Sequence, residues 1–371
     1  MNNRTFFSKH TTKALFASLL LLLLSLLCTS CGRNPADDGK LRIVATVFSE
    51  YDWVREILGD NPAGAELTLL TEKGVDMHSY QPSTGDLLKI AKCDLFLYVG
   101  GESDAWVQKA LSGAKNDRRI AVNLLGILGS DAREEELVEG MEHGDDHAND
   151  DRHADGDRPD SDSHDADSDG DSHGGDASRG ENRGNHGEGG IEYDEHVWLS
   201  LRNAAKFVTR ISESLQTLDP EHAETYKKNA EAYLAKLSAL DEQYKKAVEA
   251  APVKTLLFGD RFPFRYLTED YGLTYYAAFV GCSAETEASF ATITFLAGKL
   301  DELALPAVLT IEGSDGKLAQ TVSKTAKPDP TRKILSLNSL QSVTKADIDA
   351  GATYLGIMTD NLDVLRVALG L

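Results

Sequence analysis

Short apolar runs alternate with amphipathic segments along most of the chain, and this alternation predicts the fold. The apolar runs are rich in Val, Ile and Leu and have the continuous apolar character of strands buried on both faces, which is typical of parallel sheets. Four such runs lie at 41–48, 66–70, 94–99 and 119–125, and four more lie at 255–258, 273–279, 307–311 and 334–337. Helical patterns lie between them. A repeated β–α order predicts doubly wound α/β lobes.

The segment 220–251 has the pattern of one long helix. Asp219 suits the N-cap and Pro220 the first turn. Tyr226, Leu237 and Val248 belong to a stripe of apolar positions spaced three and four residues apart. About 30 residues at 1.5 Å each give roughly 45 Å, enough to run along two lobes. We therefore predict an α/β fold of two four-stranded parallel-sheet lobes, 40–219 and 252–371, joined by one long rigid helix.

An acidic, histidine-rich tract at 131–192 interrupts this pattern. It contains few apolar residues, so it cannot bury enough surface to offset its ordering entropy and is predicted to be disordered. Residues 131–195 hold 24 Asp and Glu against five Arg, which is −19 of the net charge of −22. The rest of the chain is near neutral, which argues against nucleic-acid binding.

Histidine tracts are typical of auxiliary metal binding, because imidazole and carboxylate groups both bind divalent metals. The alternative is a solvated acidic loop whose histidines are incidental. The six histidines of the tract are His143, His147, His153, His164, His173 and His186.

The N-terminus has the pattern of a targeting segment. Basic residues precede the leucine-rich run 14–27, and small residues precede Cys31. This order is typical of a secretory signal and resembles a bacterial lipoprotein cleavage site. We therefore expect a signal peptide at 1–31 that ends at a lipidated Cys31, followed by a polar tether at 32–39. An N-terminal membrane anchor is the alternative, although the run is short for one.

Two cysteines, Cys93 and Cys282, remain after such cleavage. Cys93 begins a predicted buried strand and is expected to be a free thiol, whereas Cys282 is expected in a loop of the second lobe. A disulfide between them is possible but not indicated, and these two cysteines do not form a CxxC pair that would indicate a thiolate metal cluster.

Polar side chains that could bind a metal follow several predicted strands. Ligands of α/β sheets bind beyond the carboxyl ends of the strands, and His196 lies where the acidic tract gives way to an ordered apolar segment. One metal between the lobes could reach several of these residues. The residues at strand ends are His78, Glu102, Asp260, Glu312 and Asn338.

Several stretches resemble one known family, the zinc/manganese substrate-binding proteins of bacterial ABC importers. These stretches are GVDMHSYQPSTGD, YDEHVWLSLRNA, the histidine-rich tract between them, AETEAS, and TYLGIMTDNLDVLRVAL at the end. The similarity runs from about Leu41 to Leu371, and the zinc-uptake branch looks closest. The resemblance implies two α/β lobes bridged by a rigid helix, with the metal in the interlobe cleft.

The resemblance also implies metal ligands. The family's first two histidines fall on His78 and His196. Its third follows the first strand of the second lobe, where this chain has no histidine and Asp260 is the nearest candidate. Asn338 stands where some members have Asp. We predict the set His78, His196, Asp260 and Glu312, with Glu285, Glu287 and Asn338 as alternatives; His222 is expected at the surface.

The expected function is capture of Zn²⁺ outside the cytoplasm and its delivery to an ABC-type permease with its ATPase. The protein is expected to be a lipid-anchored monomer on the bacterial cell membrane. Two imidazoles with carboxylate oxygens suit zinc, whereas oxygen-richer coordination favours Mn²⁺. A Mn²⁺-specific binding protein and a metal-binding surface adhesin are therefore alternatives. A zinc-dependent hydrolase is a third, although the sequence lacks an HExxH motif.

Overall fold

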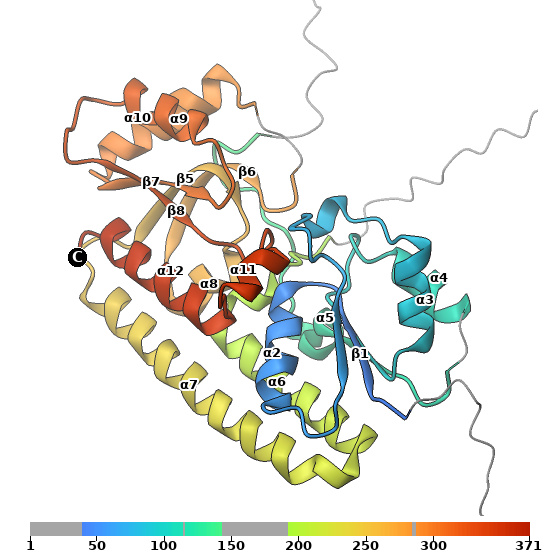
Figure 1. Cartoon of the computed structure of the whole chain (residues 1–371). Helices are drawn as coiled ribbons and strands as arrows, with labels where there is room; N and C mark the ends of the chain where they lie inside the picture. Colours follow the sequence, from blue (N-terminus) through green and yellow to red (C-terminus); the bar gives the residue numbers. More distant parts are fainter. Residues whose placement is uncertain (1–38, 114–115, 143–191, 284–286) are drawn as a thin grey trace, which may run out of the picture.

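The chain folds into two α/β lobes, each built on a four-stranded parallel sheet (Figure 1). The computed structural model describes residues 39–113, 116–142, 192–283 and 287–371. The first sheet has the order β2-β1-β3-β4 and the second the order β6-β5-β7-β8, so the two lobes share one strand order. This confirms the predicted fold class. The strands are β1 (Arg42–Ala45), β2 (Glu66–Leu69), β3 (Leu95–Tyr98), β4 (Ile120–Asn123), β5 (Thr255–Phe262), β6 (Thr274–Val280), β7 (Ala307–Ile311) and β8 (Lys333–Leu337).

Two helices of the first lobe, α3 and α5, begin at polar capping residues. Ser83 accepts a hydrogen bond from the backbone of Asp86, whose carboxylate accepts one in return, and this capping box starts α3. Asn123 caps the short α5 in the same way through the backbone of Gly126. The helices of this lobe are α2 (Phe48–Leu58), α3 (Thr84–Lys92), α4 (Trp106–Gly113) and α5 (Leu124–Leu128), with one 3₁₀ turn, η1 (Met77–Ser79), and a second, η2 (Gly129–Asp131).

Two long helices, α6 (Leu201–Leu218) and α7 (Ala223–Ala250), pack against each other, and α7 runs along both lobes (Figure 1). Its apolar stripe is buried, and the hydroxyl of Tyr244 donates to the carbonyl of Met358 in the second lobe at 2.6 Å. The helix begins three residues later than predicted, because Pro220–His222 form a 3₁₀ turn, η4. A further 3₁₀ turn, η3 (Val197–Leu199), precedes α6.

In the second lobe, the helical segment after β8 is divided into two helices, Lys345–Asp349 and Tyr354–Ala368. Gly351 adopts φ of +100°, a conformation that L side chains rarely adopt, and the chain breaks there. The side chain of Ser289 caps the helix between β6 and β7 by accepting the backbone N–H of Thr292. The helices of this lobe are α8 (Arg265–Tyr271), α9 (Phe290–Glu302), α10 (Lys317–Thr325), α11 (Lys345–Asp349) and α12 (Tyr354–Ala368).

Direct hydrogen bonds join the two lobes. The indole of Trp198 donates to the carbonyl of Ser339 at 2.8 Å, and the backbone N–H of Tyr354 donates to the buried carboxylate of Asp52 at 2.7 Å. Near the cleft, the backbone N–H of Lys345 donates to the carbonyl of Glu72 at 2.7 Å. The lobes therefore meet along most of their shared face.

Residues 131–142, which the sequence assigned to the disordered tract, lie within the folded body. The backbone N–H of Glu142 donates to the carbonyl of Ala278 on β6, and Glu134 forms a β-bridge with Tyr193. The segment thus leaves the first lobe and runs along the second before the tract begins. Cys31, the signal peptide, all but the last residue of the tether and the six tract histidines lie outside the described residues. Within the described residues, no helix is long and apolar enough to cross a membrane.

Candidate metal centre

His78 lies on the connection after β2, in the 3₁₀ turn η1. The carboxylate of Asp76 accepts the backbone N–H of His78 at 3.1 Å and so begins this turn. The ring is positioned by its Nδ1 atom, which lies 2.7 Å from the hydroxyl of Ser103 and 3.5 Å from the carboxylate of Glu195. Nε2 is therefore the atom that His78 presents to the space between the lobes.

His196 is fully buried directly before η3. One oxygen of Asp194 accepts the backbone N–H of His196 at 2.8 Å and lies 3.0 Å from its Nδ1. The ring packs edge-on against Trp198. A carboxylate on Nδ1 fixes the ring and raises the basicity of the other nitrogen, which is the arrangement usual around histidines that bind metals.

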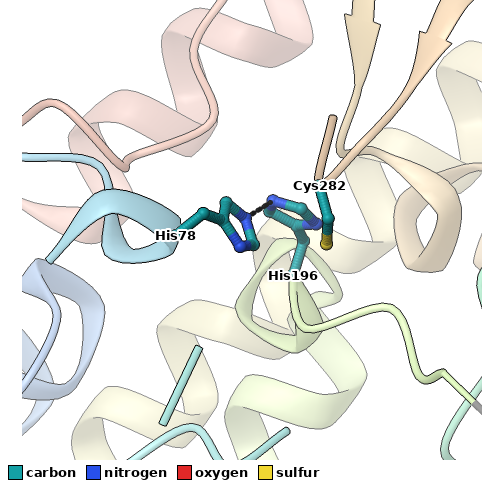
Figure 2. A group of neighbouring side chains, drawn as sticks. All are labelled: His78, His196 and Cys282. Carbon is teal, nitrogen blue, oxygen red and sulfur yellow. Dashed lines mark hydrogen bonds between the residues drawn. The ribbon is translucent and has the colours of Figure 1, made fainter. Parts of the chain in front are cut away.

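The two Nε2 atoms face each other at 3.2 Å (Figure 2). Two nitrogen ligands of a tetrahedral zinc ion, each at 2.0–2.1 Å, are separated by about 3.3–3.4 Å. The observed separation therefore already fits two ligands of one ion. The structure brings together the two histidines that the sequence predicted from opposite sides of the acidic tract.

Burial and mutual repulsion give the two rings different proton affinities. Burial, and then the nearby His196, lower the pKa of His78 to about 4. Burial also acts to lower the pKa of His196, but the carboxylates of Asp194, Asp76 and Glu195 together raise that pKa. A hydrogen bond joins the two Nε2 atoms, so one proton lies between them. A metal cation would replace this proton in the same place.

Cys282 completes a group of three potential ligands with the two histidines (Figure 2). Its sulfur and one ring nitrogen of each histidine all lie within 4.8 Å of one another. The residue follows β6 by two positions, and its backbone N–H donates to the carboxylate of Glu135 at 3.0 Å. Burial, and then Glu135, raise the pKa of its thiol well above the usual range. Sequence reasoning missed Cys282 because it searched for paired cysteines; its position just beyond an apolar strand was the available signal.

Asp260 lies at a β-bulge and is not part of this group. The sequence predicted that the strand ends at Phe258, but β5 continues to Phe262 through the bulge. The carboxylate of Asp260 accepts the backbone N–H groups of Arg261 at 2.9 Å and of Ile311 on β7 at 3.3 Å. Its side chain therefore completes the sheet at the bulge.

Glu312 also bonds to backbone rather than joining the histidines. Its carboxylate accepts hydrogen bonds from the backbone N–H groups of Ser339, Gln341 and Ser342 and from two serine hydroxyls. The side chain of Asn338 accepts the backbone N–H of Leu340, and its backbone bonds to the side chain of Asn361. These side chains hold the connection after β8 in place.

A polar cavity of about 1000 Å³ opens between the lobes. Asp76, Asp260, Glu287 and Glu312 line it, so the predicted carboxylates face the cleft without reaching the histidine pair. Asp76 comes near, with one oxygen 4.0 Å from Nε2 of His78. Glu285 lies outside the described residues, and His222 bonds to Asp219 away from the site.

The fold and this site are those of a two-lobed α/β binding protein that presents ligands between its lobes. Comparison with known proteins makes the assignment specific. The chain belongs to the family described as zinc-uptake complex component A, periplasmic, whose model matches residues 43–368.

Individual relatives agree with this assignment. The chain is 30% identical to the zinc-binding lipoprotein AdcA of Streptococcus pneumoniae over 94% of its own length and 60% of that protein, so it spans about three fifths of this relative. It is 27% identical to the high-affinity zinc uptake system protein ZnuA of Bacillus subtilis, over 93% of this chain and 94% of that one. The crystal structure of the Zn(II)-bound ZnuA-like domain of AdcA superposes with a TM-score of 0.63 at 28% identity, over 90% of this chain and all of that domain.

Proposed function

We propose that this protein captures Zn²⁺ between its lobes and delivers it to the permease of an ABC-type importer. The observation that carries the proposal is the pair of Nε2 atoms 3.2 Å apart, each on a ring whose Nδ1 is already engaged. Membership of a zinc-uptake family supports the same cargo. His78 and His196 are the ligands to which we assign capture.

The surroundings of the pair also suit a cation. Asp194, Glu195 and Asp76 place carboxylates beside the two rings, and Asp194 and Glu195 are nearly inaccessible to solvent. Buried carboxylates are stabilised by a bound cation. We further propose that the chain works as a monomer outside the cytoplasm, held to the membrane by lipid on Cys31, with a permease and its ATPase as partners.

Zinc titration of three variants tests the capture site. His78→Ala and His196→Ala each remove one ligand, so zinc affinity should fall by at least about a hundredfold, more than the 10–100-fold usual for losing a residue that only supports a ligand. His222→Ala is the matched control, because His222 bonds to Asp219 at the start of α7. If both ligand variants bind zinc as the control does, the site is wrongly assigned.

Binding without catalysis is the second part of the proposal. A zinc ion with an open water position is also a catalytic arrangement. Zinc-loaded protein should give no hydrolysis of esters, phosphates or peptides above that of His196→Ala. Hydrolysis that depends on His196 would instead identify an enzyme.

A further inference from the structure

We propose that Cys282, as a thiolate, supplies the second lobe's ligand to this metal and sets the preference of the site for zinc over manganese. The inference rests on the proposed function, because it adds a third ligand to the histidine pair. It replaces the carboxylates predicted for the second lobe with a sulfur ligand.

The loop that carries Cys282 is built to lie against His196. A Cβ atom on Gly281 would lie 3.0 Å from Cε1 of His196 and 3.0 Å from the carbonyl of Phe262, so a larger residue would push the loop away from the ring. Glu135 accepts the backbone N–H of Cys282. The thiol is therefore held beside the buried histidine by contacts on both sides.

Arg261 ties this loop to the loop of His78. Its guanidinium donates to the carbonyl of Ser283 at 3.2 Å and to the carboxylate of Asp76 at 3.0 Å. Asp76 in turn accepts the backbone N–H of His78. One side chain thus fixes the position of His78 relative to Cys282 across the interlobe boundary.

The three side chains are close enough to share one ion after a rearrangement of the site. Zinc–sulfur bonds of about 2.3 Å and zinc–nitrogen bonds of 2.0–2.1 Å separate the ligand atoms by about 3.6 Å in a tetrahedron. The sulfur lies within 4.8 Å of one ring nitrogen of each histidine, so the side chains must move closer together before all three bind one ion. As the zinc–sulfur bond forms, the S–H bond breaks and its proton passes to solvent. Two neutral imidazoles and one thiolate then leave a net charge of +1 and one open position for water.

The other second-lobe candidates are engaged elsewhere. Both oxygens of Asp260 accept backbone N–H groups at the bulge, and the carboxylate of Glu312 holds the connection after β8. A thiolate is a soft ligand that selects zinc, whereas Mn²⁺ favours carboxylate, carbonyl and water. A site with two imidazoles and a thiolate therefore selects zinc over Mn²⁺ through the type of its ligands, and not only through the general order of metal affinities.

Cobalt(II) substitution tests the thiolate directly, because a cobalt–thiolate bond gives an intense near-ultraviolet charge-transfer band that imidazole and carboxylate do not give. We use the full chain in detergent with Cys28→Ser and Cys31→Ser, so that Cys93 and Cys282 are the remaining thiols. The band should appear in this protein and in the matched control Cys93→Ser, and it should be absent from Cys282→Ser. A missing band in the parent, or a band that survives in Cys282→Ser, overturns the inference.

Metal competition tests the specificity. Cys282→Ser should lower zinc affinity by at least about a hundredfold. Cys282→Asp should recover part of that affinity but bind Mn²⁺ better than the parent does, which lowers the zinc-to-manganese ratio by at least about tenfold. An unchanged ratio in Cys282→Asp, or parental zinc affinity in Cys282→Ser, overturns the role of Cys282 and leaves capture by the histidines standing. If zinc binding did not depend on His78 and His196, that result would instead overturn the proposed function.

Discussion

The two lobes share a strand order but differ in where they bury charge. In the first lobe, the carboxyl groups of Glu50, Asp52 and Asp104 are almost inaccessible to solvent, and Asp194 and Glu195 are buried beside His196. Among the described residues of the second lobe, no acidic residue is buried to this extent, and the one comparably buried charged side chain is Arg332, which is 5% exposed and paired with Asp301. The other buried polar residues there are uncharged: Thr268, Thr292, Thr310, Ser339, Gln341 and Asn361. Topology alone therefore does not determine which lobe is prepared for a cation.

The ligands themselves occupy equivalent places in the two lobes. His78 follows β2 and Cys282 follows β6. Each of these strands is an edge strand, and the two hold the same place in their sheets. His196 lies between the lobes, on the segment before α6. The first lobe and this segment contribute fixed histidines with buried carboxylates around them, and the second lobe contributes a single loop. We infer from this difference that the first lobe receives the cation and that the second lobe completes the coordination shell of the metal.

The buried acids of the first lobe should make its stability depend on pH. Burial, and then repulsion from Asp104, raise the pKa of Glu50 to about 8. Burial likewise raises the pKa of Asp52 and of Asp104 to about 6 each. Because the unfolded chain loses these protons at lower pH, the stability that these three acids contribute is greatest in acid and is lost as the pH rises through these values.

Replacing Glu50 should give the largest change. In Glu50→Gln, the decline in the free energy of unfolding between pH 5 and 8 should be less steep than in wild type by about 1.4 kcal/mol per pH unit. Denaturant unfolding across this range measures it. Glu66→Gln is the control, because the Glu66 carboxylate is exposed on β2. Parallel pH profiles for wild type and Glu50→Gln would show that the buried charge does not distinguish the lobes.

In the second lobe, the carboxylate of Glu312 should matter for the stability of the fold. Glu312→Ala removes the acceptor for three backbone N–H groups after β8 and should lower the free energy of unfolding by about 3 kcal/mol. Zinc affinity of the folded protein should change by less than about threefold, because Glu312 does not join the histidine group.

Thermal unfolding and zinc competition on the same samples separate these two effects. Asp315→Ala is the control, since Asp315 is an exposed partner of Lys317 in the same connection and surface ion pairs contribute little. A Glu312→Ala protein of normal stability with weakened zinc binding would make Glu312 a ligand after all.

Asp260 and Glu312 show where sequence reasoning stops. The alternation of apolar runs predicted all eight strands and their parallel arrangement, because burial on both faces leaves a readable pattern. It also placed both residues near strand ends facing the cleft, where they lie. The pattern could not reveal the bulge in β5, because a bulge depends on backbone pairing with neighbouring strands.

The histidine pair was predictable for a different reason. His78 and His196 each lie in a distinctive stretch next to an ordered apolar segment, whereas Cys282 is a single cysteine in a loop. Its closeness to the histidines depends on how the two lobes dock, through Glu135, Arg261 and Gly281. Contacts between lobes combine residues far apart in sequence, so no local pattern contains them.

Arg261 links the loops that carry His78 and Cys282. Replacing it should lower zinc affinity less than replacing a ligand does. Arg261→Leu removes the link between Asp76 and Ser283, which supports both ligand loops without touching a ligand atom. Zinc affinity should fall by about tenfold, the lower end of the effect usual for residues that position metal ligands. Isothermal titration against Arg202→Leu, whose charge lies on α6, provides the comparison. Stronger binding in Arg261→Leu would mean that its positive charge repels the ion more than its contacts help.

Removing the acidic tract should have the smallest effect on the tight site. Its composition predicts that 143–191 adds no packed core, and the described contacts at its two ends persist without it: Glu142 bonds to Ala278, and Glu135 bonds to the carbonyl of Glu192. Replacing 143–191 by a flexible linker should change the free energy of unfolding by less than about 1 kcal/mol. The first zinc ion should bind as in wild type, while weaker additional binding is lost with the six histidines.

Equilibrium dialysis over a range of zinc concentrations counts both classes of site. A variant with all six histidines replaced by Asn separates the loss of the imidazole groups from the loss of the segment itself. Tight zinc binding that is lost in the deletion variant but kept in the Asn variant would show that the tract holds the lobes in their binding arrangement. The tract would then be a third structural part of the site, besides the two lobes.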